Sequence, residues 1–196
     1  MWRRVAILAG LSGFLIVLGL SARWTVADHY VIPTSSMSPS IQAFDRVVVN
    51  KAAYDLRLPF TTWSLARFDG PQRGDVIVLD SPTDERLLVK RVVGLPGDMV
   101  AVRNGRVVIN GREMFVEMTQ RGLVEHLGEQ VHPVQLTEAG GPDFGPVMVD
   151  PNEYFVMGDN RGNSRDGRAF GLVPRQAIRG KVIGVYYRDG LSWFDL

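Results

Sequence analysis

The chain has 196 residues, enough for one compact domain with its own core and an appended or inserted segment. Its 22 basic and 21 acidic residues leave a formal charge of +1, which gives no electrostatic reason to expect nucleic acid as a partner. The absence of cysteine excludes disulfides, thiolate metal sites and a cysteine nucleophile. His29, His126 and His132 lack the spacing of metal ligands, so we expect surface or loop histidines, no metal and no cofactor.

Residues 5–22 form an uncharged apolar run, VAILAGLSGFLIVLGLSA, about as long as a helix that crosses a bilayer. Arg3 and Arg4 precede the run and Arg23 follows it, a small difference that favours a cytoplasmic N-terminus. A cleavable secretory signal has similar flanks but a shorter apolar core. We therefore expect residues 1–24 to form a cytoplasmic N-terminus and one retained transmembrane helix, with the rest of the chain outside.

Beyond this run, short segments rich in β-branched and aromatic residues recur along the chain. They are residues 46–50 (RVVVN), 75–79 (DVIVL), 87–93 (LLVKRVV), 153–157 (EYFVM) and 181–187 (KVIGVYY). Turn-forming residues separate them, and no long amphipathic helix is evident. The pattern predicts a mainly β protein built on an antiparallel sheet.

The middle of the chain is expected to form a small unit of its own. In the stretch MVAVRNGRVVINGREMFV, the pairs Asn104-Gly105 and Asn110-Gly111 stand between β-prone runs. These pairs suit tight turns that need positive φ, so the stretch predicts a small meander. Residues 122–151 are rich in Gly, Pro, Glu and Gln with weak periodicity, which indicates a loop-rich insertion or subdomain.

The first segment with chemical content is residues 32–41, IPTSSMSPSI, which holds four serines and a threonine. On composition alone a polar linker is the better interpretation, because Ser, Thr and Pro mark loops more often than nucleophiles. A serine nucleophile also needs a base, and no histidine stands in a recognisable relation to these serines.

The second segment is residues 87–98, LLVKRVVGLPGD, where Lys90 interrupts an apolar β-branched run. Successive strand residues point to opposite faces, so Lys90 and Arg91 cannot both point outward and one faces inward. Apolar surroundings lower a lysine pKa from about 10.4 toward values at which the neutral amine is a general base. A shift of two units costs roughly 2.7 kcal/mol. Equally, Lys90 can extend to the sheet edge or pair with Asp84 or Glu85.

The third segment is residues 158–174, GDNRGNSRDGRAFGLVP, which is dense in turn formers and follows a predicted strand. Ser164, Asp166 and Arg168 alternate by two. In an extended conformation they share a face, where Asp166 and Arg168 can pair and leave the Ser164 hydroxyl oriented. A solvated turn explains the same composition, and this segment alone does not favour a function.

Together and in this order, the segments resemble type I signal peptidases, the serine/lysine endopeptidases of the bacterial membrane. The blocks SSMSPSI, RGDVIVL, LVKRVVGLPGD and GDNRGNSRDGRAFGLVP follow the apolar run collinearly and cover most of the chain. The resemblance implies an enzyme that removes N-terminal signal peptides from exported preproteins by cutting after small residues, in the pattern Ala-X-Ala. It also implies a single-pass protein of the bacterial inner (plasma) membrane, with its catalytic domain on the periplasmic or extracytoplasmic side.

By this resemblance Ser36 is the nucleophile and Lys90 is its general base. The resemblance places the Thr34 hydroxyl and the backbone N–H of Ser36 in the oxyanion hole. A further set of residues orients the lysine and supports its loop, namely Ser164, Asp166 and Arg168. Apolar residues near Met37 and the strand of Lys90 are candidate linings for a substrate bound as an extended strand.

The resemblance also implies how the chain is divided. We expect a catalytic β domain of residues 25–100 and 151–196, with a small β cap subdomain of residues 101–150 inserted in it. The sequence departs from the family pattern in three places. Ser35 stands where Gly is frequent, Phe44-Asp45 where Gly-Asp is frequent, and Gly162 where an acidic residue is frequent. Ser35 leaves two adjacent hydroxyls as candidate nucleophiles.

Two kinds of alternative remain open. One is a dedicated peptidase for a single conjugation or pilus precursor, or the related peptidase of mitochondrial inner membranes. The other is an inactive, membrane-tethered β domain that binds extended peptides. The first would ignore a panel of Ala-X-Ala precursors, and the second would cleave nothing.

Overall fold

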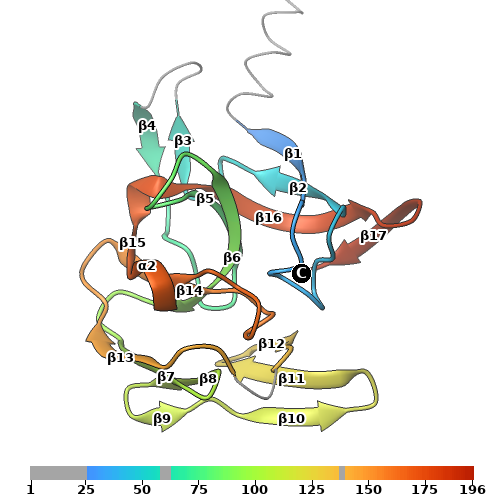
Figure 1. Cartoon of the computed structure of the whole chain (residues 1–196). Coiled ribbons are helices and arrows are strands. Elements are labelled where there is room, and N and C mark those ends of the chain that lie inside the picture. The colour runs from blue at the N-terminus through green and yellow to red at the C-terminus, as the bar shows by residue number, and fades with distance from the viewer. Residues whose placement is uncertain (1–25, 58–62, 137–139) are drawn as a thin grey trace, which may run out of the picture.

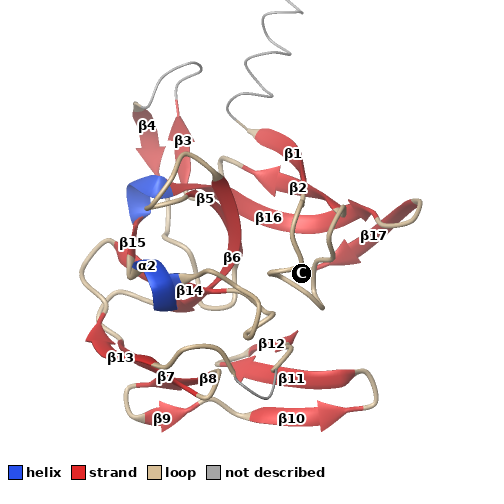
Figure 2. Cartoon of the chain, in the orientation of Figure 1, coloured by secondary structure: helices blue, strands red, loops and turns tan. Residues whose placement is uncertain are grey.

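The computed structural model describes residues 26–57, 63–136 and 140–196. The predicted membrane anchor, residues 1–24, lies outside these ranges. Within them, no helix combines the length and the apolar character needed to span a membrane. Helix in this part is limited to α2 (Gly167–Phe170) and a 3₁₀ turn, η1 (Arg175–Ala177). The prediction of a mainly β protein is therefore confirmed (Figure 2).

A curled sheet of eight strands forms the upper body in Figure 1. Its order is β1-β2-β16-β5-β6-β14-β15, with β17 also paired to β16, and every pairing is antiparallel. The strands are β1 (Ala27–Val31), β2 (Arg46–Asn50), β5 (Val76–Asp80), β6 (Leu87–Gly94), β14 (Glu153–Met157), β15 (Val173–Pro174), β16 (Ile178–Tyr187) and β17 (Leu191–Asp195). All five strand segments predicted from the sequence lie in this sheet.

The central strands of this sheet are buried on both faces. Val76 and Val78 of β5 pack in one apolar core, whereas the intervening Ile77 and Leu79 pack in another. A strand that is covered on both sides reads as a continuous apolar run, which is why VIVL shows no polar alternation. The same double coverage extends to β6 and determines the surroundings of its charged residues.

Two smaller sheets lie below the main sheet in Figure 1. One has the order β13-β7-β8-β9 and the other β10-β11-β12. Their strands are β7 (Met99–Arg103), β8 (Arg106–Ile109), β9 (Arg112–Glu113), β10 (Val116–Thr119), β11 (Gly122–Leu127), β12 (Gln130–Pro133) and β13 (Phe144–Met148). Their core joins Val100, Val107 and Leu127 to Phe155 and Met157 of β14, so the small sheets rest on the main one. A separate ribbon pairs β3 (Asp55–Arg57) with β4 (Ser64–Arg67).

The predicted meander is confirmed, and its turns have the expected conformation. Asn104 and Gly105 have φ of 50° and 77°, and Asn110 and Gly111 have φ of 53° and 79°. The expectation of a loop-rich stretch at residues 122–151 is wrong in part, because β11, β12 and β13 all lie there. Glycine, proline and charged residues obscured these short strands, which are stabilised by packing on their neighbours rather than by their own β propensity.

Candidate active site

Two apolar side chains hold the serine-rich segment between β1 and β2. Met37 and Ile41 are both 0% exposed and pack among the valines of the main sheet. The Ile41 N–H donates to the Met37 carbonyl at 2.9 Å and closes a turn between them. Ser36, directly before Met37, is thereby fixed at the margin of the core with its side chain partly exposed.

Lys90 meets Ser36 from the middle of β6. Its Nζ lies 2.8 Å from Ser36 Oγ and also donates to the Val89 carbonyl at 2.9 Å. The lysine is 3% exposed, and burial lowers the pKa of its amine to about 8, although the carboxylates of Asp166 and Asp159 act in the opposite direction. The structure thus brings together the two residues that the sequence placed 54 positions apart.

The alternative positions for Lys90 are not adopted. Asp84, a candidate partner from the sequence, instead accepts a hydrogen bond from Arg86 Nε at 2.9 Å. The expectation that Lys90 and Arg91 do not both point outward is confirmed, and burial goes further than expected, because the two side chains are 3% and 4% exposed. Both are buried because β6 is covered on its two faces.

Two donors lie near the Ser36 hydroxyl. Thr34 Oγ1 donates to Ser36 Oγ at 3.3 Å. The backbone N–H of Ser36 has no hydrogen-bond partner among the residues that the structure describes. An anion that forms beside Ser36 Oγ would therefore find a hydroxyl and an N–H available to it.

The loop after β14 is hydrogen-bonded to the serine segment. The Asn160 N–H donates to the Ser36 carbonyl at 3.1 Å, and Asn160 Nδ2 donates to the Ser35 carbonyl at 3.2 Å. Asn163 Nδ2 donates to Ser35 Oγ at 3.3 Å. The two adjacent hydroxyls thus have different partners, with Ser36 facing the amine and Ser35 the amide. Neither asparagine was predicted from the sequence as a site residue, although both stand in the block GDNRGNSRDGR.

A groove of about 380 Å³ passes over Ser36 and Lys90. One wall is the end of β1 and the residues up to Ser36, and the other is the first half of β6 with Arg86. Both walls offer strand edges. The described partner of β1 is β2, and β14 pairs with β6 from Arg91 onward, which leaves Leu87 to Lys90 paired on one side by β5.

The amino-acid sequence is similar to a known family of peptidases over most of its length. Residues 4–187 match the family model described as signal peptidase, peptidase S26. The chain belongs to this family. It is 35% identical over 187 residues to signal peptidase I S of Bacillus subtilis (strain 168), covering 95% of this chain and 88% of that one. It is 34% identical over 181 residues to signal peptidase I of Leptolyngbya laminosa, covering 87% of this chain and 74% of that one. Membership makes the chain a serine endopeptidase.

A crystal structure of a signal peptidase I from Enterococcus faecalis V583 also aligns with this chain. The sequences are 30% identical, the alignment covers 58% of this chain and 97% of the other, and the TM-score is 0.44.

In the present chain, Asp166 and Arg168 form a buried ion pair. Arg168 Nε donates to Asp166 Oδ1 at 2.8 Å and Nη2 donates to Oδ2 at 2.9 Å. The segment is not extended as expected, because Asp166 caps α2 and accepts the Arg168 N–H. Burial raises the pKa of the Asp166 carboxyl, but Arg168 outweighs it and the pKa lies below its usual range.

Ser164 does not hydrogen-bond the lysine that it was expected to orient. Its Oγ is buried and, among the residues that the structure describes, no partner meets the geometry of a full hydrogen bond, although the hydroxyl lies close enough to the Asp166 carboxylate to help lower the pKa of that carboxyl. The amine of Lys90 bonds Ser36 and the Val89 carbonyl, so the structure does not join Ser164 to the lysine by a hydrogen bond. A Cβ on Gly158 would lie 2.2 Å from Ser164 Oγ, which shows how closely this hydroxyl packs on the loop.

That close packing predicts a strong effect of Gly158→Ala. The new Cβ would also lie 2.4 Å from the backbone carbonyl oxygen of Ser36, so the Ser36 segment must shift to relieve the contact. A displacement of about 1 Å at reacting groups can cost on the order of 10²-fold in rate, so we expect precursor cleavage to fall at least roughly tenfold.

Gly162→Ala is the matched control for this variant, since Gly162 is an exposed glycine of the same loop. Its cleavage rate should stay close to that of the wild type. Cleavage assays on both variants test the prediction, and full activity in Gly158→Ala would show that the tight approach is dispensable.

A second ion pair, missed from the sequence, supports the other end of this loop. Arg91 Nε and Nη2 donate to the two carboxylate oxygens of Asp159 at 2.8 and 2.7 Å, and Nη1 donates to the Gly74 carbonyl at 2.7 Å. Burial raises the pKa of the Asp159 carboxyl, but the Arg91 charge outweighs it and the pKa lies below its usual range. The pair Lys90-Arg91 within an apolar strand was the only available indication of this ion pair, because the alternation of a strand allows either side chain to point inward.

His132 corrects the expectation that the histidines are surface or loop residues. It lies in β12 and is 4% exposed, with Nε2 3.4 Å from Glu125 Oε2 and 3.7 Å from Asp159 Oδ1. Burial lowers the pKa of its imidazole to about 3, and the charge of Arg91 adds to this effect. Among residues 26–57, 63–136 and 140–196, no group of three or more His, Asp or Glu side chains is arranged to hold a metal.

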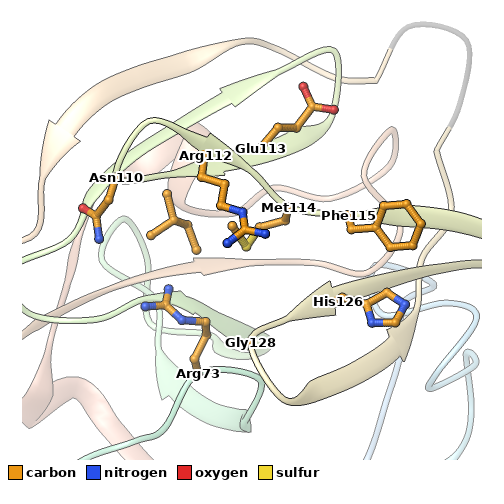
Figure 3. A pocket seen from close by; sticks show the side chains of 9 residues that line it. Arg73, Asn110, Arg112, Glu113, Met114, Phe115, His126 and Gly128 are labelled. Atoms are coloured by element: carbon orange, nitrogen blue, oxygen red, sulfur yellow. The ribbon is translucent and has the colours of Figure 1, made fainter.

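Another hollow, of about 480 Å³, lies in the small sheets and contains none of the site residues. Figure 3 shows Arg73 and Arg112 near its middle and the rings of Phe115 and His126 at one end. Arg73 is already engaged there, because it donates to Asp98 Oδ2 at 2.8 Å.

Proposed function

We propose that the chain removes N-terminal signal peptides from exported preproteins, with Ser36 as the nucleophile and Lys90 as its general base. The cut falls after small residues in the pattern Ala-X-Ala. The observation that carries this proposal is the 2.8 Å contact between Ser36 Oγ and the buried amine of Lys90, whose pKa is lowered to about 8. A base must reach the proton that it abstracts and must be neutral at working pH, and this contact supports both conditions.

The lowered pKa changes the supply of neutral amine by a large factor. At pH 7 a lysine with its pKa at about 8 is neutral in roughly one molecule in ten, against roughly one in three thousand for an ordinary lysine. The neutral Nζ accepts the Ser36 proton as Oγ attacks the scissile carbonyl carbon. The protonated amine then gives that proton to the departing nitrogen, and water hydrolyses the acyl-serine by the same route in reverse roles.

The tetrahedral intermediate carries a negative oxygen that needs donors. The donors that we assign to it are the Ser36 N–H, which has no partner among the described residues, and the Thr34 hydroxyl, 3.3 Å from Ser36 Oγ. Such donors act on the charge that develops in the transition state, and the loss of one typically costs about 3 kcal/mol. We assign Ser164, Asp166 and Arg168 to the support of the lysine and its loop.

The groove supports binding of the precursor as an extended strand. Its two walls present backbone edges, and a peptide between them gains main-chain hydrogen bonds as in other cases of strand addition. Ile32, Val78 and Val89 line the groove near Ser36 and give its floor an apolar character. We propose that the small side chains next to the cut lie against this apolar floor.

We also propose how the chain is arranged at the membrane. Residues 1–24 anchor it in the bacterial inner (plasma) membrane with the N-terminus in the cytoplasm. Residues 25–100 and 151–196 form the catalytic domain on the outer side, and residues 101–150 form the inserted cap subdomain. The separate sheets of β7 to β13 support this division. Lipid is thus a partner along with the preproteins, whose apolar signal segments stay in the bilayer near the site.

The test is cleavage of purified precursors by the full chain, isolated from membranes in detergent, with the product ends read by mass spectrometry. Ser36→Ala should reduce the rate by at least roughly 10³-fold, because the covalent route is lost. Ser35→Ala is the matched control. Its hydroxyl has a hydrogen bond to Asn163 and none to Lys90, so we expect the rate to fall by less than roughly tenfold.

The outcomes separate the alternatives. Loss of cleavage in Ser35→Ala but not in Ser36→Ala would identify Ser35 as the nucleophile. Cleavage of one precursor in a panel would favour a dedicated peptidase, and cleavage of none would favour a peptide-binding domain. Recovery of the full chain in the soluble fraction without detergent would contradict the anchor.

A further inference from the structure

The loop that holds Ser36 is itself tied to the small sheets by one buried arginine. Arg161 is 1% exposed, and all three of its guanidinium nitrogens are used. Nη1 donates to Glu125 Oε1 at 2.9 Å and to the Gly105 carbonyl at 2.8 Å, and Nη2 donates to Glu125 Oε2. Nε donates to the Gly158 carbonyl at 3.1 Å. The arginine therefore joins its own loop to β11 and to the turn after β7.

Glu125 is the charged end of this connection. It lies in β11, is 0% exposed, and meets the guanidinium with both carboxylate oxygens. A two-point contact between planar groups fixes both distance and orientation, which a single hydrogen bond does not. The backbone adds a second contact between the same parts. The Arg161 N–H donates to the Gln135 carbonyl, and the Gln135 N–H donates to the Asp159 carbonyl, each at 2.9 Å.

One residue separates this junction from Ser36. Asn160, directly before Arg161, uses its N–H on the Ser36 carbonyl and its side-chain amide on the Ser35 carbonyl. The position of Arg161 therefore sets the position of Asn160, and Asn160 sets the position of Ser36. A connection of fixed geometry thus runs from β11 through the loop to the hydroxyl that faces Lys90.

We propose that Glu125, a residue of the small sheets, is a positioning residue for the Ser36 hydroxyl and acts on it through Arg161 and Asn160. The small sheets then have a role in the chemical step besides any contact with substrate. The catalytic part of this inference rests on the proposed function, whereas the positioning of the loop does not.

The test compares Glu125→Gln with the wild-type full chain in detergent. Glutamine keeps the size of the side chain and one acceptor but replaces the other acceptor by an amide that faces a guanidinium nitrogen. We expect kcat to fall roughly 10- to 100-fold with KM within about threefold, because the substrate groove is intact and the reacting atoms are displaced. Hydrogen exchange should quicken roughly tenfold at the amides of Asn160 and Arg161.

Glu117→Gln is the matched control. Glu117 is an exposed glutamate of β10 that pairs with His126. Its replacement by glutamine is the same chemical change in the small sheets, at a residue that does not contact the loop. It should leave kcat and both exchange rates unchanged. The double variant Glu125→Leu with Arg161→Met removes both charges of this ion pair and leaves neither one buried without its partner, so it keeps the test valid if Glu125→Gln folds poorly. That variant should fold and still show the lowered kcat.

The results distinguish the inference from the proposed function. Unchanged kcat in a folded Glu125→Gln protein would overturn the inference, as would a loss that appears in KM alone or equals the fraction unfolded. If the wild type cleaves no precursor, the proposed function fails. Exchange at the Asn160 and Arg161 amides then still decides whether Glu125 positions the loop, and unchanged exchange rejects it.

Discussion

Replacing Lys90 with methionine is expected to abolish precursor cleavage and, at pH 7, to raise the free energy of unfolding. Below about pH 8 the amine is protonated in both the folded and the unfolded chain, so the folded protein carries a buried charge. The pKa falls from 10.5 to about 8 on folding, which corresponds to about 3 kcal/mol against the folded state. Methionine fills a similar volume without that charge and should recover most of this free energy.

The sign of the pH dependence follows from the same shift. Between about pH 8 and 10.5 the folded wild type loses its proton while the unfolded chain keeps it, so wild-type stability rises with pH. The advantage of Lys90→Met should therefore be largest below pH 8 and disappear above pH 10.5. Cleavage by the wild type should rise through the same pKa of about 8, since the neutral amine is the form that we propose as the general base.

Urea unfolding at several pH values, together with a cleavage assay, checks this prediction. Lys181→Met is the control. Lys181 has a more exposed side chain and pairs with Asp75, so its replacement removes an ion pair and should give no gain in stability. A Lys90→Met protein that is less stable than the wild type at pH 7 would contradict the account of a destabilising buried amine.

Removing Asp159 is expected to produce the largest loss of stability. Its carboxylate is 1% exposed and receives two hydrogen bonds from Arg91, itself 4% exposed. Asp159→Ala leaves the guanidinium charge buried without its partner, a change that typically costs about 3–5 kcal/mol. Cleavage should fall as well, because the loop of Asn160 begins at this residue.

Urea midpoints measure this effect. The double variant Arg91→Met with Asp159→Leu removes both charges and should regain most of the lost stability, since a buried pair and an apolar replacement are often equivalent. Asp84→Ala breaks an exposed pair with Arg86 and should leave the midpoint unchanged. Equal midpoints for Asp159→Ala and Asp84→Ala would show that the buried pair contributes no more than a surface one.

The strands of the main sheet were predictable because their signal is local. Runs such as RVVVN and EYFVM became β2 and β14 with the expected bounds. The Asn-Gly turns were predictable for the same reason, because positive φ is a property of the dipeptide itself. Short strands of the small sheets were not, since β11 and β12 owe their stability to packing that their composition does not reveal.

The candidate site divides in the same way. Ser36 and Lys90 were predicted as partners through family resemblance, and their roles stay a prediction that the 2.8 Å contact supports. The burial of His132, Glu125 and Arg161 could not be predicted. Glu125 and Arg161 lie 36 positions apart, and nothing in either local sequence indicates that a charge there is buried and paired.

Among the described residues, the segment Leu87–Lys90 of β6 is paired with β5 on one side and has no partner strand on the other. This has a consequence for where a precursor can be cut. A peptide that adds to Leu87–Lys90 becomes a strand of the sheet, so its side chains alternate between the groove floor and solvent. The residue before the cut and the one two places earlier then face the same wall, and the residue between them faces away. A slip of one residue would exchange these faces, so sites are offered to Ser36 only in steps of two. The two-residue spacing of small side chains in the Ala-X-Ala pattern that we propose would then match the two-residue repeat of a β-strand.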